Sequence, residues 1–200
     1  MTTLVIDRST TKTTVVLAED GGAPRAAELG IWNTSGSAAP LDGDALRGVG
    51  RIIVGTGPGS FAGIRSSLAF AMGVAIGLRG RTEVLGIPSP AAFAREGRRI
   101  AVVGDARRGK YWIALFDGFS PEREIFQVER DGLLAAVPGD ASVVSPDFAR
   151  IGGILAETFG ERASAAPTLD AAWLHRAALA NPALLSAEPL PVYLNPAVRT

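Results

Sequence analysis

The residues of this sequence that are best suited to chemistry lie around two aspartates. Asp7 precedes the hydroxyls of Ser9 and Thr10, and Asp105 precedes a turn that ends at Gly109. An aspartate at the end of a buried strand can hold a hydrated Mg²⁺, while hydroxyls and turn amides cradle phosphate. We therefore treat Asp7, Ser9, Thr10, Asp105 and Gly109 as candidate nucleotide-binding residues.

The second of these turns is the weaker candidate. Arg107, Arg108 and Lys110 replace the small hydroxyl residues of the first turn. Two ordinary hairpins with solvent-facing carboxylates are the alternative interpretation. A nucleotide site on this chain alone is therefore a hypothesis that competes with a purely structural one.

A glycine-rich segment from Val54 to Arg65 is the sharpest local motif. Ser60 is a good N-cap for the apolar helix predicted after it, because its hydroxyl can accept a bond from a free helix amide. An anion can bind at such a helix N-terminus. The segment lacks the Gly-Lys-Ser/Thr of a nucleotide P-loop and the G-x-G-x-x-G spacing of a dinucleotide turn. A tight strand-to-helix turn that serves packing is the alternative.

Composition removes several classes of function. The 200 residues include no Cys and one His, and Lys+Arg and Asp+Glu number 20 each. The missing thiols exclude disulfide scaffolds and Cys-ligated metals, and one His, His175, cannot form a two-imidazole site. The zero net charge argues against a general nucleic-acid coat or a membrane-surface protein. We expect no bound metal, no membrane partner and a cytoplasmic location.

The elements that must position the aspartates occur twice. At a constant offset of 98 residues Asp7 aligns with Asp105, Val15 with Ile113, and Leu17 with Leu115. Each half opens with strand, aspartate, turn and strand, and then alternates strands and helices, which predicts an α/β fold with mixed sheets flanked by helices. We predict two lobes, residues 1–97 and 98–200. The predicted strands are residues 4–6, 13–18, 27–31, 51–54, 83–87, 100–104, 111–116, 125–129 and 142–145, and the main helices are 60–79, 147–159 and 169–180.

Four segments together resemble the TsaB (YeaZ) family of bacterial tRNA threonylcarbamoyladenosine biosynthesis. The segment from Gly57 to Arg65 is similar to the signature GPGSFTGLR, and the segment from Val5 to Thr10 is similar to the opening IDTST. Residues 105–112 look like DARRGEVYW, and residues 191–196 look like a terminal PVYLR. The matches occur in order over nearly the whole chain.

The resemblance implies an actin/Hsp70-like (ASKHA) fold of two RNase H-like lobes. It also implies a non-catalytic role, with no catalytic residue in this chain, as a partner of the transferase TsaD and the ATPase TsaE, or as a homodimer, meeting tRNA only indirectly. A tightly bound cofactor is not expected, although Mg-ATP or ADP at the partner interface fits the resemblance. The partner-interface residues that it implies, on the helix after the signature, are Ser60, Phe61, Ile64, Arg65, Leu68 and Met72.

One departure from the family bears on this interface. The helix that precedes the signature in TsaB relatives is replaced here by a short, Gly- and Pro-broken stretch from Asn33 to Gly50. Two alternatives therefore stay open. The chain could be a diverged paralogue with another partner, or a small ASKHA ATPase or kinase that binds Mg-ATP between its lobes.

Overall fold

The computed structural model describes residues 1–19, 22–28, 39–40 and 43–194, which form two compact units. Unit 1 comprises Met1–Ala92 and Leu169–Val192, and unit 2 comprises Phe93–Thr168 and the residues from Tyr193. The division differs from the predicted boundary at residue 97, because helix α5 (Ala171–Ala180) packs on the first two strands of unit 1. The backbone N–H of Ala171 donates to Thr14 Oγ1 at 2.9 Å, which fixes the start of that helix.

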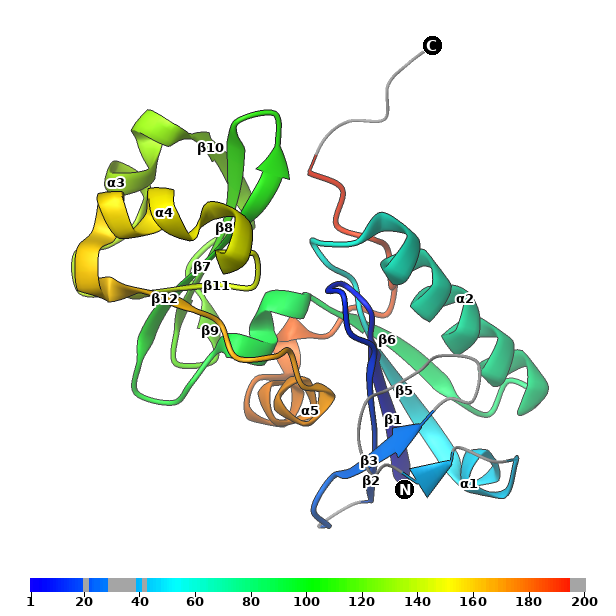
Figure 1. The fold of residues 1–200 in the computed structure, drawn as a ribbon. Helices are drawn as coiled ribbons and strands as arrows, with labels where there is room; N and C mark the ends of the chain where they lie inside the picture. Colours follow the sequence, from blue (N-terminus) through cyan, green and yellow to red (C-terminus); the bar gives the residue numbers. More distant parts are fainter. Residues whose placement is uncertain (20–21, 29–38, 41–42, 195–200) are drawn as a thin grey trace. The chain divides into compact units, whose positions relative to one another are not determined.

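Unit 1 is built on a six-stranded mixed sheet (Figure 1). In spatial order its strands are β4 (Ala39–Pro40), β3 (Arg25–Glu28), β2 (Thr14–Glu19), β1 (Thr2–Asp7), β5 (Val49–Gly55) and β6 (Glu83–Ile87). β1 pairs antiparallel with β2 and parallel with β5. α2 (Phe61–Gly77) and α5 cover opposite faces of the sheet. The remaining helices are α1 (Gly43–Arg47), η1 (Ser89–Phe93) and η4 (Pro182–Leu184).

Unit 2 repeats this topology. In spatial order its strands are β10 (Phe126–Glu129), β8 (Lys110–Asp117), β7 (Arg99–Arg107), β11 (Ser142–Ser145) and β12 (Ala163–Ala165), with β9 (Ser120–Pro121) beside β8. Its helices are η2 (Arg130–Gly132), α3 (Leu133–Ala136), α4 (Phe148–Phe159) and η3 (Gly160–Arg162). Both units begin with an antiparallel hairpin and continue with strands parallel to its first member. The predicted α/β class, with two mixed sheets flanked by helices, is confirmed.

Each core lies between a sheet and one helix, which is α2 after β5 in unit 1 and α4 after β11 in unit 2. Ile64 and Leu68 of α2 pack on Leu4 and Ile6 in unit 1, and Ile151 and Leu155 of α4 pack on Val103 in unit 2. Alternate residues of a strand point to opposite faces, so these clusters define the equivalent face of each sheet. The aligned pairs Val15/Ile113 and Leu17/Leu115 both lie on that face.

The aspartates aligned at the same offset are not structurally equivalent. Asp7 pairs with Thr14, whereas Asp105 pairs with Tyr111 because the second hairpin has a shorter turn. Asp7 follows the core residue Ile6 and so points to the face away from α2, while Asp105 lies two residues after Val103 on the α4 face. The gapless alignment is therefore wrong at the aspartates.

This register predicts that Gly104 cannot carry a side chain. A Cβ there would lie 2.2 Å from the buried indole ring of Trp112, its cross-strand partner. We expect Gly104→Ala to lower the free energy of unfolding by roughly 1–3 kcal/mol, as overpacking does. Gly153→Ala on α4 is the control, since nothing lies within 4 Å of its Cβ and alanine favours helix. Chemical denaturation measures both, and equal stability of the two variants would contradict the assigned register.

Candidate functional site

The glycine-rich loop after β5 is held by bonds to the end of β6 and to η1. Thr56 N donates to Ile87 O at 2.9 Å, and Ser89 N donates to Gly57 O at 3.0 Å. Gly57 N donates in turn to Ser89 Oγ at 2.9 Å. The peptide bond between Gly57 and Pro58 is cis. The loop conformation is thus fixed by backbone bonds to the neighbouring strand rather than by its own sequence alone.

The chain between β1 and β2 passes directly over this loop and the first turn of α2. A Cβ on Gly59 would lie 2.1 Å from Ser9 O, and a Cβ on Gly63 would lie 2.0 Å from Arg8 O. Ser9 O also accepts a 2.7 Å bond from Ser60 N. These two glycines are required because backbone packs against backbone. Arg8 and Ser9 therefore cover one side of the amino end of α2, while Ser60 and Phe61 on its other side are exposed.

Ser60 is the N-cap of α2, as predicted. Its Oγ accepts a bond from Gly63 N at 3.2 Å, and its carbonyl accepts from Ile64 N at 2.9 Å. Arg8 reaches the same turn, since its guanidinium donates to Ser66 Oγ at 2.8 Å. The signature segment therefore joins the opening hairpin to the helix.

Asp7 has no exposed surface and is bonded on both carboxylate oxygens. Oδ1 accepts bonds from Ser9 N and Ser9 Oγ, both at 2.6 Å, and Oδ2 accepts from Ser89 Oγ at 2.5 Å. A Cβ on Gly55 would lie 1.6 Å from Oδ2, so only glycine fits at the end of β5. Burial raises the pKa of Asp7, and the bonds from Ser89 and Ser9 only partly offset this effect.

This environment does not suit a carboxylate that holds a hydrated cation. Such a group needs an oxygen facing solvent, and both oxygens of Asp7 are bonded within unit 1. Ser9 is buried as well, and Thr10 Oγ1 donates to Lys12 O at 3.2 Å within its own turn. The structure brings Asp7 and Ser9 together, but in hydrogen bonds within unit 1 and not in a ligand site.

Asp105 of unit 2 is surrounded by arginines. Its Oδ2 lies 3.3 Å from the guanidinium of Arg107 and 3.6 Å from that of Arg150, and its Oδ1 accepts a 2.7 Å bond from Arg107 N. Gly109 lies in the adjacent turn at φ 74°. Asp147, at the start of α4, accepts a bond from Asp105 N at 2.9 Å and is paired with Arg150. Asp105 is thus the centre of a surface ion-pair network.

The six predicted interface residues divide between the two sides of α2. Ile64 and Leu68 are buried in the core of unit 1, so they are not among the α2 residues that this structure leaves exposed. Phe61 and Met72 are more than half exposed, and Arg65 lies over the Phe61 ring, 5.1 Å from its centroid. Ser60 is exposed at the cap.

Sequence reasoning missed two features. Ile76 is 78% exposed on the same side of α2. The hydroxyl of Ser89 joins Asp7 to the glycine-rich loop. A serine held between Pro88 and Pro90 directly after a buried strand was the available signal.

Other chemical groups do not gather near this loop. Among the described residues no three His, Asp or Glu side chains group closely enough to hold a metal ion. Within the same residues no helix is long and apolar enough to cross a membrane. His175 lies on the buried side of α5, which agrees with a packing role.

No family model and no curated protein matches the sequence. Two solved structures match over nearly their whole length. YeaZ from Pseudomonas aeruginosa aligns with a TM-score of 0.69 and 22% identity, over 96% of this chain and 99% of that one. The chain has the YeaZ fold. An uncharacterized protein with similarity to peptidase YeaZ from Pseudomonas aeruginosa aligns with a TM-score of 0.71 and 19% identity, over 97% and 99%.

The buried carboxyl in this version of the YeaZ fold predicts a specific pH dependence. The pKa of Asp7 is raised above the ~3.9 of an unfolded aspartate. Above about pH 4 the unfolded chain releases this proton more readily than the folded chain. The contribution of Asp7 to stability is therefore fully present below that pH and is lost as pH rises through the folded pKa.

Asp7→Asn keeps the shape and the acceptor for Ser9 but cannot titrate, so it isolates this contribution. We expect the free energy of unfolding of the wild type, minus that of Asp7→Asn, to fall as pH rises above about 4. Urea denaturation at a series of pH values measures this difference. A difference that is flat above about pH 4 and decreases on acidification below it would mean that hydrogen bonding outweighs burial at this carboxyl.

Proposed function

We propose that this protein is a TsaB-family subunit without catalytic activity of its own, which binds a TsaD-like transferase through the exposed side of α2. The proposal combines the YeaZ fold with the sequence resemblance in four segments. In this proposal the complex, together with a TsaE-like ATPase, forms N6-threonylcarbamoyladenosine in cytoplasmic tRNA, and tRNA is met through the partner. A homodimer through the same surface is the alternative assembly.

The composition of α2 carries the proposal. This 17-residue helix has one charged residue, Arg65, so it is apolar on its outer side as well as its inner side. A helix that is apolar all round is normally buried. Yet Phe61, Met72 and Ile76 are exposed, with Ala69 and Gly73 between them, which leaves room for close approach of a second helix. Such a surface is typical of a protein interface.

The site geometry weighs against the ATPase alternative. Asp7 is internally bonded, and Asp105 is paired with arginines on a face of its sheet that is not equivalent to that of Asp7. Asp7 has no exposed surface, and the partly exposed Asp105 is already paired with cations. Nucleotide binding at the partner interface stays a prediction. The role of the stretch from Asn33 to Gly50 stays open, and residues 33–38 and 41–42 of it lie outside the described residues.

Met72→Glu should disrupt the complex, because a charge would be buried in an apolar interface. We expect the affinity for the cognate TsaD-like protein to fall at least about tenfold, or roughly 1.4 kcal/mol, and reconstituted threonylcarbamoylation to fall with it. Leu179→Glu, on the exposed side of α5, is the matched control. Size-exclusion co-elution and calorimetry measure binding. Unchanged binding by Met72→Glu would remove α2 as the docking surface, and failure of the wild type to co-elute would refute the partnership.

The isolated chain should not bind Mg-ATP at millimolar concentration, because the carboxyl of Asp7 is already engaged. Titration calorimetry with Mg-ATP tests this expectation. A saturable isotherm that Asp7→Asn abolishes would favour the ATPase alternative. Heat that appears only after the partner is added would instead support a nucleotide site at the interface.

A further inference from the structure

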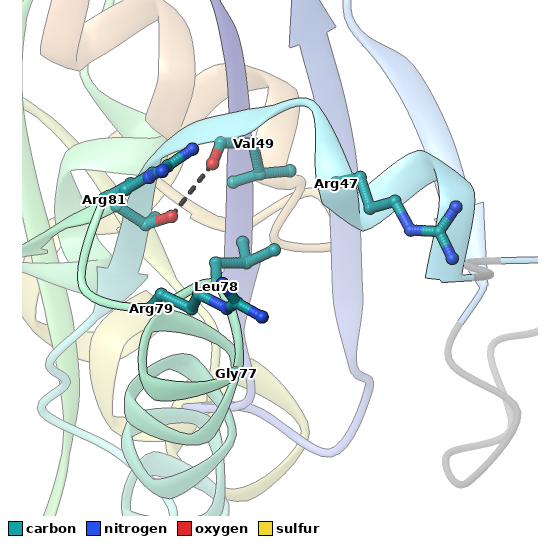
Figure 2. Close-up of a pocket in the computed structure, with 7 residues that line it drawn as sticks. Arg47, Val49, Gly77, Leu78, Arg79 and Arg81 are labelled. Atoms are coloured by element: carbon teal, nitrogen blue, oxygen red, sulfur yellow. Dashed lines mark hydrogen bonds between the residues drawn. The ribbon is translucent and has the colours of Figure 1, made fainter.

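A pocket of about 270 Å³ lies at the carboxyl end of α2, at the opposite end of the helix from the glycine-rich loop (Figure 2). Four segments of unit 1 line it: the end of α1, the start of β5, the last turn of α2 and the loop that leads to β6. The lining residues include Arg47, Val49, Leu78, Arg79, Arg81 and Thr82. Thr82 Oγ1 donates to Val49 O at 2.9 Å, which ties the loop to β5.

Three arginines and no Asp or Glu are among the residues that line the pocket. Arg47 pairs with Asp44 at 2.7 Å, but both side chains are about four-fifths exposed, so this pair is weak and readily exchanged. Glu83, next to Thr82, is already paired with Arg51. In the part of the chain that the structure describes, Arg79 and Arg81 form no salt bridge.

The end of α2 explains only part of this charge. The partial negative charge at a helix carboxyl end is about half an elementary charge, so one cation is enough to compensate it. Three arginines surround this end, and only Arg47 has a carboxylate partner among the described residues. A surplus of positive charge therefore remains, and it favours an anion.

The backbone conformation of Arg79 also supports an anion site at this end of α2. Arg79 N donates to Ile76 O and Gly80 N donates to Ala75 O, which is the Schellman ending of a helix. Its left-handed position is normally glycine, but here it is Arg79, at φ 59°. A residue with a Cβ is disfavoured in this conformation. An arginine at this position therefore sacrifices some stability to place its charge at the pocket.

We propose that this arginine pocket binds phosphate groups. Guanidinium forks bind phosphate oxygens in pairs, and arginine is favoured wherever phosphate is recognised in this way. The volume is just below the ~300–1,000 Å³ of typical small-molecule pockets, which suits a diphosphate rather than a large ligand. The phosphates can belong to a small diphosphate or to an RNA backbone, which share this chemistry. The site is separate from the docking surface of the proposed function and does not depend on it.

The test variant removes charge without disturbing the fold. Arg79→Gly restores the residue type that the left-handed position prefers, and Arg81→Gln removes the charge of an exposed side chain but keeps a polar group there. We expect this double variant to unfold at the same denaturant concentration as the wild type or at a higher one. Arg123→Gln with Arg130→Gln, two exposed arginines of unit 2, is the control with the same change in net charge.

Titration calorimetry of the full chain at constant ionic strength uses pyrophosphate in one arm and unfractionated tRNA in the other. We expect pyrophosphate to bind the wild type and the control alike, and its affinity to fall at least tenfold in the double variant. If the double variant loses affinity for tRNA alone, the result would support phosphate binding at the pocket and would identify the ligand as RNA phosphates. No binding in either arm, or equal binding by the double variant and the control, would overturn the proposal.

Discussion

The carboxyl group of Asp7 joins three segments that are distant in sequence. Through Ser9 it fixes the chain that leaves β1, and through Ser89 it reaches η1 and the amide of Gly57 in the glycine-rich loop. A buried carboxyl is stable only when its oxygens are bonded, so these partners are constrained together. Gly55, Gly59 and Gly63 lack side chains because backbone or carboxylate occupies the space a Cβ would take. The GPGS segment thus has a structural explanation that needs no bound phosphate.

The hydrogen bonds around Asp7 set where α2 begins and which side of the helix faces outward. The cap at Ser60 and the bond from Ser60 N to Ser9 O hold the first turn against the opening hairpin. Ile64 and Leu68 then enter the core, while Phe61 and Met72 are left exposed. Exposed apolar area of this kind is stabilised by contact with a partner. In our proposals the motif serves to present a helix face, and the arginine pocket at the other end of that helix binds phosphate.

The repeat was predicted from sequence correctly in its topology and incorrectly in its register. Most of the predicted strands are correct, and so are the equivalent pairs Val15/Ile113 and Leu17/Leu115. These predictions do not depend on the length of the turn, because each requires only that a residue lie on the core face of its strand. Asp7 and Asp105 do not, because the shorter second turn moves the pairing by one residue, and a shift of one residue reverses the face. The alignment could not show this, since it contains no gap at the turn.

The sequence by itself determined the α/β class, most strand and helix positions, the cap at Ser60 and the likeness to YeaZ. These follow from local patterns of apolar, capping and turn residues, which are readable without tertiary contacts. Only the tertiary structure decided that α5 belongs to unit 1, that Asp7 is bonded to Ser89, and that Ile64 and Ile76 take opposite sides of α2. Each of these features depends on contacts between segments that are tens of residues apart in the sequence. Burial and hydrogen-bond pairing between such distant segments are set by how the helices and strands pack.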